Sequence, residues 1–183
     1  MKKILSMAIA GALAFAGSAN AADVEAGVVK NLPSKVEAKF LKQHSVDIDT
    51  TLIDSLKQKA PAQGISHYEV IGVLSSQNNG WENLYDPART STVEDHGGSS
   101  LYVAVLQVGY GNPNQANMNG ISKSVFLTEN RCGSDLHVCN VGETITGFVY
   151  YYNYSGQQSG LFQTSANSVA NPFGYWSDSI YIR

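Results

Sequence analysis

The sequence carries little charge and contains no basic cluster. Only 15% of its 183 residues are charged, and the formal net charge is −3. Lysine and arginine are not gathered into the stripe or patch with which nucleic-acid-binding proteins meet phosphates. We therefore expect no nucleic acid partner.

The sequence also lacks an apolar run long enough to cross a bilayer comfortably. Its N-terminal apolar run, residues 4–17, follows two lysines and precedes Ala19 and Ala21, the small residues that a signal peptidase reads. This pattern predicts a signal peptide over residues 1–21, cleaved after Ala21, in preference to a membrane anchor. Ala22 rather than cysteine follows, so no lipid anchor is indicated. We expect a secreted or periplasmic protein with no integral membrane span after cleavage.

Recognisable catalytic motifs are absent. The chain contains no Gly-x-Ser-x-Gly elbow, no His-Glu-x-x-His helix and no Walker-type loop. Serines, histidines and acids make a hydrolytic triad numerically possible, but no spacing singles one out. A paired-carboxylate glycosidase would need two acids at a fixed separation, and the sequence brings together no two of Glu69, Glu82, Glu94, Asp95 and Glu143. A non-catalytic role is therefore the favoured interpretation.

Cysteine occurs only twice in the chain. In an exported protein, Cys132 and Cys139 are expected to form a disulfide across a loop or hairpin. Closing a loop of about eight residues stabilises a fold by about 2.5 kcal/mol in the chain-entropy treatment. A redox pair is more often spaced Cys-x-x-Cys, and a zinc site needs two further ligands, of which only His137 is local. A structural disulfide is favoured over both alternatives.

Aromatic residues divide the mature chain in two. All ten tyrosines and both tryptophans lie from Gly64 onward, whereas residues 22–63 carry six acids and six lysines. Apolar residues recur at helical spacing in this first region, at Val36, Phe40 and Leu41 and again at Leu52, Ile53 and Leu56. Helices this short are marginal in isolation. We expect residues 22–63 to be a helical arm and linker packed on or tethered to the domain, or alternatively a removable pro-segment that shields a binding face.

The surest β-strand is residues 101–108, which is rich in β-branched and aromatic residues and apolar on both faces. Such a strand is usually central in its sheet and covered on both sides. Turn signals separate it from further strands expected at residues 67–74, 81–85, 122–129, 143–154, 159–164 and 176–182. Residues 64–183 are therefore expected to form an all-β domain. Its class is an antiparallel β-sandwich or partly closed barrel of six to seven strands, with a short helical N-terminal arm.

One loop gathers oxygen and nitrogen ligands before that central strand: Asp86, Glu94, Asp95 and His96. Such a set can bind calcium or a transition metal. Its spacing matches no defined metal loop, however, and Asp95 before two glycines can simply cap a turn. We expect no cofactor, and we keep a hydrolase that uses Glu94, Asp95 and His96, with or without a metal, as an alternative.

Aromatic residues suggest a binding surface. Tyr150, Tyr152 and Tyr154 share one face of a strand while Tyr151 points to the other, which predicts that one face is partly wet. Tyrosine and tryptophan rings are suited to stacking and hydrogen bonding at such a surface. The interpretation that the residues themselves favour is nevertheless that the rings pack as cross-strand pairs. The candidate surface is Trp81, Tyr150, Tyr152, Tyr154, Tyr175 and Trp176.

Four short motifs resemble the YolA-like family of small secreted bacterial proteins: Asp95-His96-Gly97-Gly98, Leu101-Tyr102-Val103, Val108-Gly109-Tyr110-Gly111 and Asn117-Met118-Asn119-Gly120. The resemblance covers roughly residues 66–183, and this chain has Asn119 where the family pattern has aspartate. It implies a secreted bacterial β-domain and transfers no catalytic residue.

Together these observations predict an exported, non-catalytic module that binds a glycan or an envelope or host protein through tyrosine, tryptophan and asparagine side chains. Shallow stacking and amide contacts of this kind are individually weak. Two alternatives remain, the hydrolase described above and a toxin-like or self-assembling envelope protein. The sequence leaves self-association open.

Overall fold

The computed structural model describes residues 41, 46–48, 63–78, 80–84, 86 and 88–183. The expected signal peptide and most of the expected helical arm and linker lie outside these residues. The described part of the chain forms eleven β-strands: β1 (His67–Ser75), β2 (Trp81–Asn83), β3 (Leu101–Val108), β4 (Gly111–Pro113), β5 (Ala116–Met118), β6 (Ile121–Lys123), β7 (Leu127–Cys132), β8 (His137–Val138), β9 (Ile145–Asn153), β10 (Gly160–Ser168) and β11 (Tyr175–Ile182).

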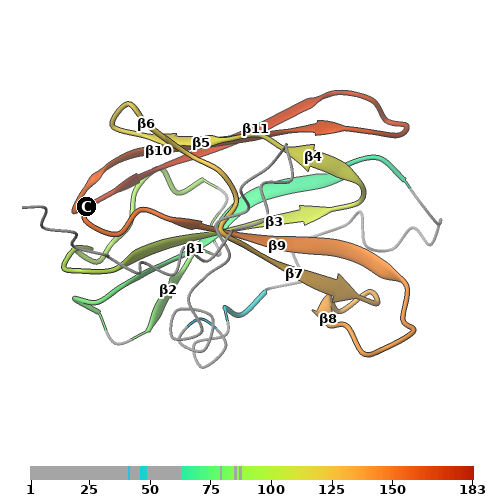
Figure 1. Ribbon diagram of the computed structural model, residues 1–183, viewed down its shortest axis with the longest axis horizontal. Coiled ribbons are helices and arrows are strands. Elements are labelled where there is room, and N and C mark those ends of the chain that lie inside the picture. The colour runs from blue at the N-terminus through green and yellow to red at the C-terminus, as the bar shows by residue number, and fades with distance from the viewer. Residues whose placement is uncertain (1–40, 42–45, 49–62, 79, 85, 87) are drawn as a thin grey trace, which may run out of the picture. The chain divides into compact units, whose positions relative to one another are not determined.

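The strands pair into two antiparallel sheets, which lie one above the other in Figure 1. The six-stranded sheet has the order β2-β1-β3-β9-β7-β8, and the five-stranded sheet has the order β11-β10-β5-β6, with β4 also paired to β10. The expected all-β antiparallel sandwich is confirmed. Strand β3 pairs with β1 and β9, and all eight of its residues are buried, as its two apolar faces predicted.

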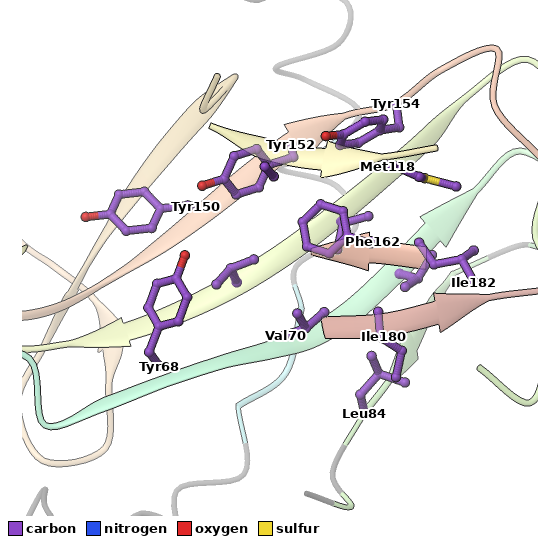
Figure 2. Packing of buried hydrophobic residues seen from close by; sticks show 14 of the residues in the cluster. Tyr68, Val70, Leu84, Met118, Tyr150, Tyr152, Tyr154, Phe162, Ile180 and Ile182 are labelled. Atoms are coloured by element: carbon purple, nitrogen blue, oxygen red, sulfur yellow. The ribbon is translucent and has the colours of Figure 1, made fainter. Parts of the chain in front are cut away.

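Tyrosines fill the space between the two sheets. Tyr150, Tyr152 and Tyr154 of β9 are 5%, 0% and 1% exposed, and Figure 2 shows them in a row beside Phe162 of β10. The centroids of the Tyr152 and Tyr154 rings both lie 5.7 Å from that of Phe162. The expectation that these three tyrosines form a partly wet binding surface is wrong, because the five-stranded sheet covers them.

The other face of the six-stranded sheet is covered as well. Leu41 and Val46, from the expected arm, are 2% and 1% exposed and belong to a second apolar cluster with residues of β1, β3 and β9, among them Tyr151. Gly72 of β1 permits this close approach, because a Cβ atom there would lie 3.0 Å from Val46 Cγ2. Leu41 and Val46 are thus part of the core.

The strand expected at residues 122–129 is in fact two strands in different sheets. Residues 119–120 form a turn with positive φ angles that folds β6 back onto β5. The chain then crosses over, and β7 pairs with β9 in the other sheet. The alternating pattern continues through the crossover, which is why it predicted one continuous strand.

The expected disulfide is present and closes the hairpin of β7 and β8. Cys132 and Cys139 are joined with their Cα atoms 5.0 Å apart, and Cys132 is 1% exposed. Gly133 and Leu136 have the positive φ angles that the tight connection requires.

Removing this disulfide is expected to lower the free energy of unfolding by about 2.5 kcal/mol, because the unfolded chain regains the entropy of an open loop. Urea unfolding of the double variant Cys132→Ala/Cys139→Ala, compared with the oxidised and reduced parent, measures the effect. Identical midpoints for all three proteins would contradict the stabilising role.

Candidate functional site

The candidate aromatic residues outside the core differ in exposure. Tyr175 is 67% exposed at the start of β11. Trp176 is half-buried against the core between the sheets, since successive strand residues point to opposite faces. Trp81 is half-buried on the other sheet, with its ring centroid 5.8 Å from that of Tyr151. Of the six residues expected at a binding surface, Tyr175 is therefore the one that is exposed to solvent.

Tyr175 belongs to an uncharged surface on the outer side of the five-stranded sheet. Residues paired across strands share a face, so the register of β11, β10, β5 and β6 places Ser179, Gln163, Asn117 and Ser122 in one row. We call this surface the outer amide face. Its members, all exposed or half-buried, are Asn112, Asn117, Ser122, Leu161, Gln163, Asn167, Tyr175, Ser177, Ser179 and Tyr181.

Tyrosines stand at both ends of the outer amide face. Tyr175 pairs with Asn167, which in turn pairs with Asn112, and Tyr181 pairs with Leu161. At about 3.3 Å per residue, the two tyrosines are about 20 Å apart along β11. Between them stand carboxamide and hydroxyl groups, which both donate and accept hydrogen bonds.

Some of these amides are held in place by their neighbours. Asn117 Nδ2 donates to Ser122 Oγ at 3.2 Å, while Asn117 Oδ1 accepts from the backbone N–H of Gly120 at 3.1 Å. Asn167 Nδ2 donates to Asn114 Oδ1 at 3.3 Å. Fixed amides present a defined pattern of donors and acceptors and lose less entropy on binding.

The loop of Glu94, Asp95 and His96, considered as an alternative active site, holds His96 in a buried hydrogen-bond network. His96 is 3% exposed, with its Nδ1 atom 3.2 Å from Ser75 Oγ and its Nε2 atom 3.0 Å from Glu82 Oε2. The three residue types are those of a hydrolytic triad, but Ser75 is 1% exposed, so this serine does not reach a substrate. Glu94 and Asp95 are exposed, and Glu82 rather than either of them is the partner of His96.

The four weak metal candidates do not converge on one point. Asp86 Oδ1 accepts from the backbone N–H of Ala88 at 2.9 Å, whereas His96 is held by Glu82. Asp95 Oδ1 lies 3.6 Å from Arg183 Nε. Within the described part of the chain, no three histidine, cysteine, aspartate or glutamate residues are grouped so that they hold a metal ion.

A polar pocket that the sequence did not predict lies between β1 and β11. It has a volume of about 230 Å³ and is lined by His67, Tyr68, Glu69, Val70, Leu84, Asp86, Arg89, Asp178, Ser179 and Ile180. His67 and Glu69 were visible only as members of larger sets of possible catalytic residues. The sequence pattern could have revealed Asp178, because it is an acid at an inward-facing strand position between Trp176 and Ile180.

Asp178 is a half-buried carboxylate bound by backbone groups. Its Oδ2 accepts from the N–H of Val70 and its Oδ1 from its neighbour Ser179, each at 2.7 Å. Burial is the largest influence and raises the pKa of Asp178 above its ordinary value, and the charge of Glu69 adds to this, although the two N–H groups act in the opposite direction. The ionised form is thus disfavoured in the folded protein.

Asp178→Asn is expected to stabilise the protein near neutral pH. A group whose pKa is raised in the folded protein stabilises the fold at pH values below the ordinary carboxyl pKa. This contribution is lost as the pH rises through the pKa of the folded protein. The neutral amide keeps an acceptor for Val70, although it loses the one that Ser179 uses, and we expect a net rise of the thermal midpoint at neutral pH. Thermal unfolding of both proteins at neutral and acidic pH measures this. A lower midpoint for the variant at neutral pH would contradict it.

Comparison with known families identifies the family of the β-domain. Residues 60–182 match the family described as "Domain of unknown function (DUF4879)". The chain belongs to this family. No curated protein matches the sequence.

The match to the DUF4879 family includes every strand of both sheets, from β1 to β11. It therefore includes the whole outer amide face, the disulfide and the pocket between β1 and β11. Leu41 and Val46, which cover the outer side of the six-stranded sheet, precede the matched residues. Among the described residues, no helix is long and apolar enough to cross a membrane.

Proposed function

We propose that this protein is an exported, non-catalytic binding module that recognises a glycan through the outer amide face. The observation that carries the proposal is a sheet face without a charged residue, built from amides and hydroxyls and bounded by exposed Tyr175 and Tyr181. An envelope or host protein is the alternative ligand.

The chemistry of the outer amide face suits a sugar. Hydroxyl groups of a glycan both donate and accept hydrogen bonds, as do the side chains of Gln163, Asn117 and Asn167. The rings of Tyr175 and Tyr181 offer apolar surfaces for stacking and hydroxyl groups for hydrogen bonding. A protein interface usually has an apolar centre, whereas the only aliphatic member of this face is Leu161. The surface thus favours a glycan over a protein.

Two features support the absence of catalysis at this face. General acid–base chemistry needs a titratable side chain within reach of the substrate, and the outer amide face has no histidine or carboxylate among its members. The hydrolase alternative depends on His96, which is enclosed between Ser75 and Glu82. Recognition through many weak polar contacts gives modest affinity unless the ligand is multivalent.

Export is supported by the N-terminal sequence and the disulfide. Disulfides persist in oxidising compartments, outside the cytosol, and the bond between Cys132 and Cys139 is formed in this protein. The resemblance to YolA-like secreted proteins points in the same direction. We propose secretion or periplasmic residence after cleavage behind Ala21.

The test is binding of the mature chain, residues 22–183 with its disulfide formed, to a broad glycan array and to whole bacterial envelopes. Tyr175→Ala is expected to weaken glycan binding about tenfold, because loss of one stacking contact costs about 1 to 1.5 kcal/mol. Val141→Ala is the matched control, since Val141 is fully exposed in a loop next to the other sheet. Absence of binding to any glycan or envelope, or equal loss in both variants, would overturn the proposal.

A further inference from the structure

The pocket between β1 and β11 differs from the outer amide face in all its lining residues except Ser179, which belongs to both. Asp178 and Ile180 point inward from this strand, whereas Ser177, Ser179 and Tyr181 point outward. The β1 side of the pocket is the part of the strand that β2 does not cover, because β2 pairs only with Gly72, Val73 and Leu74. Among the described residues, the part of β1 that lines the pocket therefore has no partner in β2.

The floor of the pocket is aliphatic. Val70, Leu84 and Ile180 line it and are each 3% exposed. Figure 2 shows these three side chains close together at one edge of the core. An aliphatic floor of this kind accommodates methylene groups rather than a hydrated ion.

The polar wall of the pocket is predominantly acidic. It contains the carboxylates of Glu69, Asp86 and Asp178 with His67 and Arg89. The guanidinium of Arg89 is already neutralised, since its NH1 atom lies 3.1 Å from Glu82 Oε1.

Asp178 forms no ion pair with another described residue, although its carboxylate is half-buried. Its hydrogen bonds come from two backbone N–H groups. The position is costly, as the raised pKa of Asp178 indicates. Proteins retain unfavourable groups of this kind mainly where they serve a function. A half-buried carboxylate that forms no ion pair among the described residues is complementary to a cationic ligand.

We propose that this pocket binds a small organic cation, an alkylammonium or guanidinium group, whose charge meets Asp178 and Glu69. The methylene stem of the cation lies on Val70, Leu84 and Ile180. The Nε2 atom of His67 lies 2.9 Å from Glu69 Oε2, and both residues line the pocket. The residues that meet the ligand charge here, Asp178 and Glu69, are not members of the outer amide face, so either site can fail without the other.

Two sources supply such a group: a lysine side chain of a protein, or an amino sugar. The probes are Nα-acetyl-lysine methylamide and the glucosamine disaccharide. Each has a neutral counterpart, in which the ligand amine is acetylated. Binding to the isotope-labelled mature chain is followed by amide NMR. The resonance of Val70, whose N–H donates to Asp178 and which lies outside the outer amide face, reports on the pocket. We expect a saturable shift of this resonance at millimolar concentrations of at least one cationic probe and none with its neutral counterpart.

Substitutions in the wall separate binding from folding. Asp178→Asn and Glu69→Gln are each expected to weaken binding of the cationic probe at least about tenfold, since each removes one charge from a partly desolvated site. Asp95→Asn is the control, because Asp95 carries the same charge at an exposed position outside the pocket. Tyr175→Ala, which impairs the outer amide face, is expected to leave cation binding unchanged.

Three results would overturn the proposal. They are equal shifts with the charged and the acetylated probes, unchanged affinity in Asp178→Asn, and absence of saturable shifts with both cationic probes. Preference for the lysine probe identifies a protein ligand and preference for the glucosamine disaccharide identifies an amino sugar, and either supports the site. Lower pH is expected to weaken binding, because protonation of the half-buried Asp178 removes negative charge from the pocket.

Discussion

Val46→Asp is expected to destabilise the protein by at least about 3 to 5 kcal/mol, the cost of an uncompensated charge in a core. Val46 is 1% exposed, and its Cγ2 methyl group packs where Gly72 has no side chain. Urea unfolding followed by tyrosine and tryptophan fluorescence measures the loss. Asp47→Ala is the matched control, because Asp47 is the next residue and is exposed. Equal midpoints for Val46→Asp and the parent would show that the arm does not contribute to the core.

The contacts of Leu41 and Val46 also bear on whether the expected arm can be removed without loss of stability. A protein that begins at Gly64 loses the burial of both Leu41 and Val46, and each large apolar side chain removed from a core costs about 2 to 5 kcal/mol. We therefore expect the shortened protein to be much less stable and to expose the outer side of the six-stranded sheet. Undiminished stability of residues 64–183 would favour the alternative of a removable pro-segment.

Glu82→Ala is expected to cost about 3 to 5 kcal/mol, because it leaves a buried network without its acceptor. The carboxylate of Glu82, whose side chain is 9% exposed, receives hydrogen bonds from four donors. They are the backbone N–H groups of Val93 at 2.7 Å and Glu94 at 2.9 Å, Arg89 NH1 at 3.1 Å and His96 Nε2 at 3.0 Å. Unfolding in urea near neutral pH measures the loss.

The dependence on pH provides a second measurement of this network. Burial, the largest single influence, raises the pKa of Glu82, but the N–H groups of Val93 and Glu94 and the ring of His96 together outweigh it and hold the pKa below its ordinary value of 4.5. A depressed pKa contributes stability above the ordinary value and loses it as the pH falls through the folded value. The stability difference between the parent and Glu82→Gln is therefore expected to shrink in acid. Glu94→Gln, with an exposed side chain, is the control; a difference that stays constant with pH would contradict the assignment.

The sequence predicted those parts of the fold that local pattern determines. Residues 101–108 were expected to be a central, doubly covered strand because both faces are apolar, and β3 is such a strand. The disulfide followed from two cysteines at short separation. The sheet change between β6 and β7 was not predictable, because no glycine, proline or asparagine interrupts residues 122–129, whereas the two strands pair in different sheets.

The candidate site was predicted less well, for a physical reason. Tyrosine is equally compatible with a buried and an exposed position, and Tyr150, Tyr152 and Tyr154 lie in the core because another sheet covers them. The outer amide face depends on register across four strands, which brings Asn117, Gln163 and Ser179 together from distant segments. Of the residues on the outer amide face, only Tyr175 belonged to the binding surface expected from the sequence.

The most direct test of glycan recognition by the outer amide face is glycan binding by Gln163→Arg. Gln163 stands in the middle of the outer amide face, paired with Ser179 on one side and Asn117 on the other. Thr128→Arg places the same side chain at an exposed position on β7 of the other sheet. We predict that Gln163→Arg weakens binding at least about tenfold with an unchanged thermal midpoint, whereas Thr128→Arg binds as the parent does. Binding that survives Gln163→Arg but is lost in Thr128→Arg would contradict the assignment of this face.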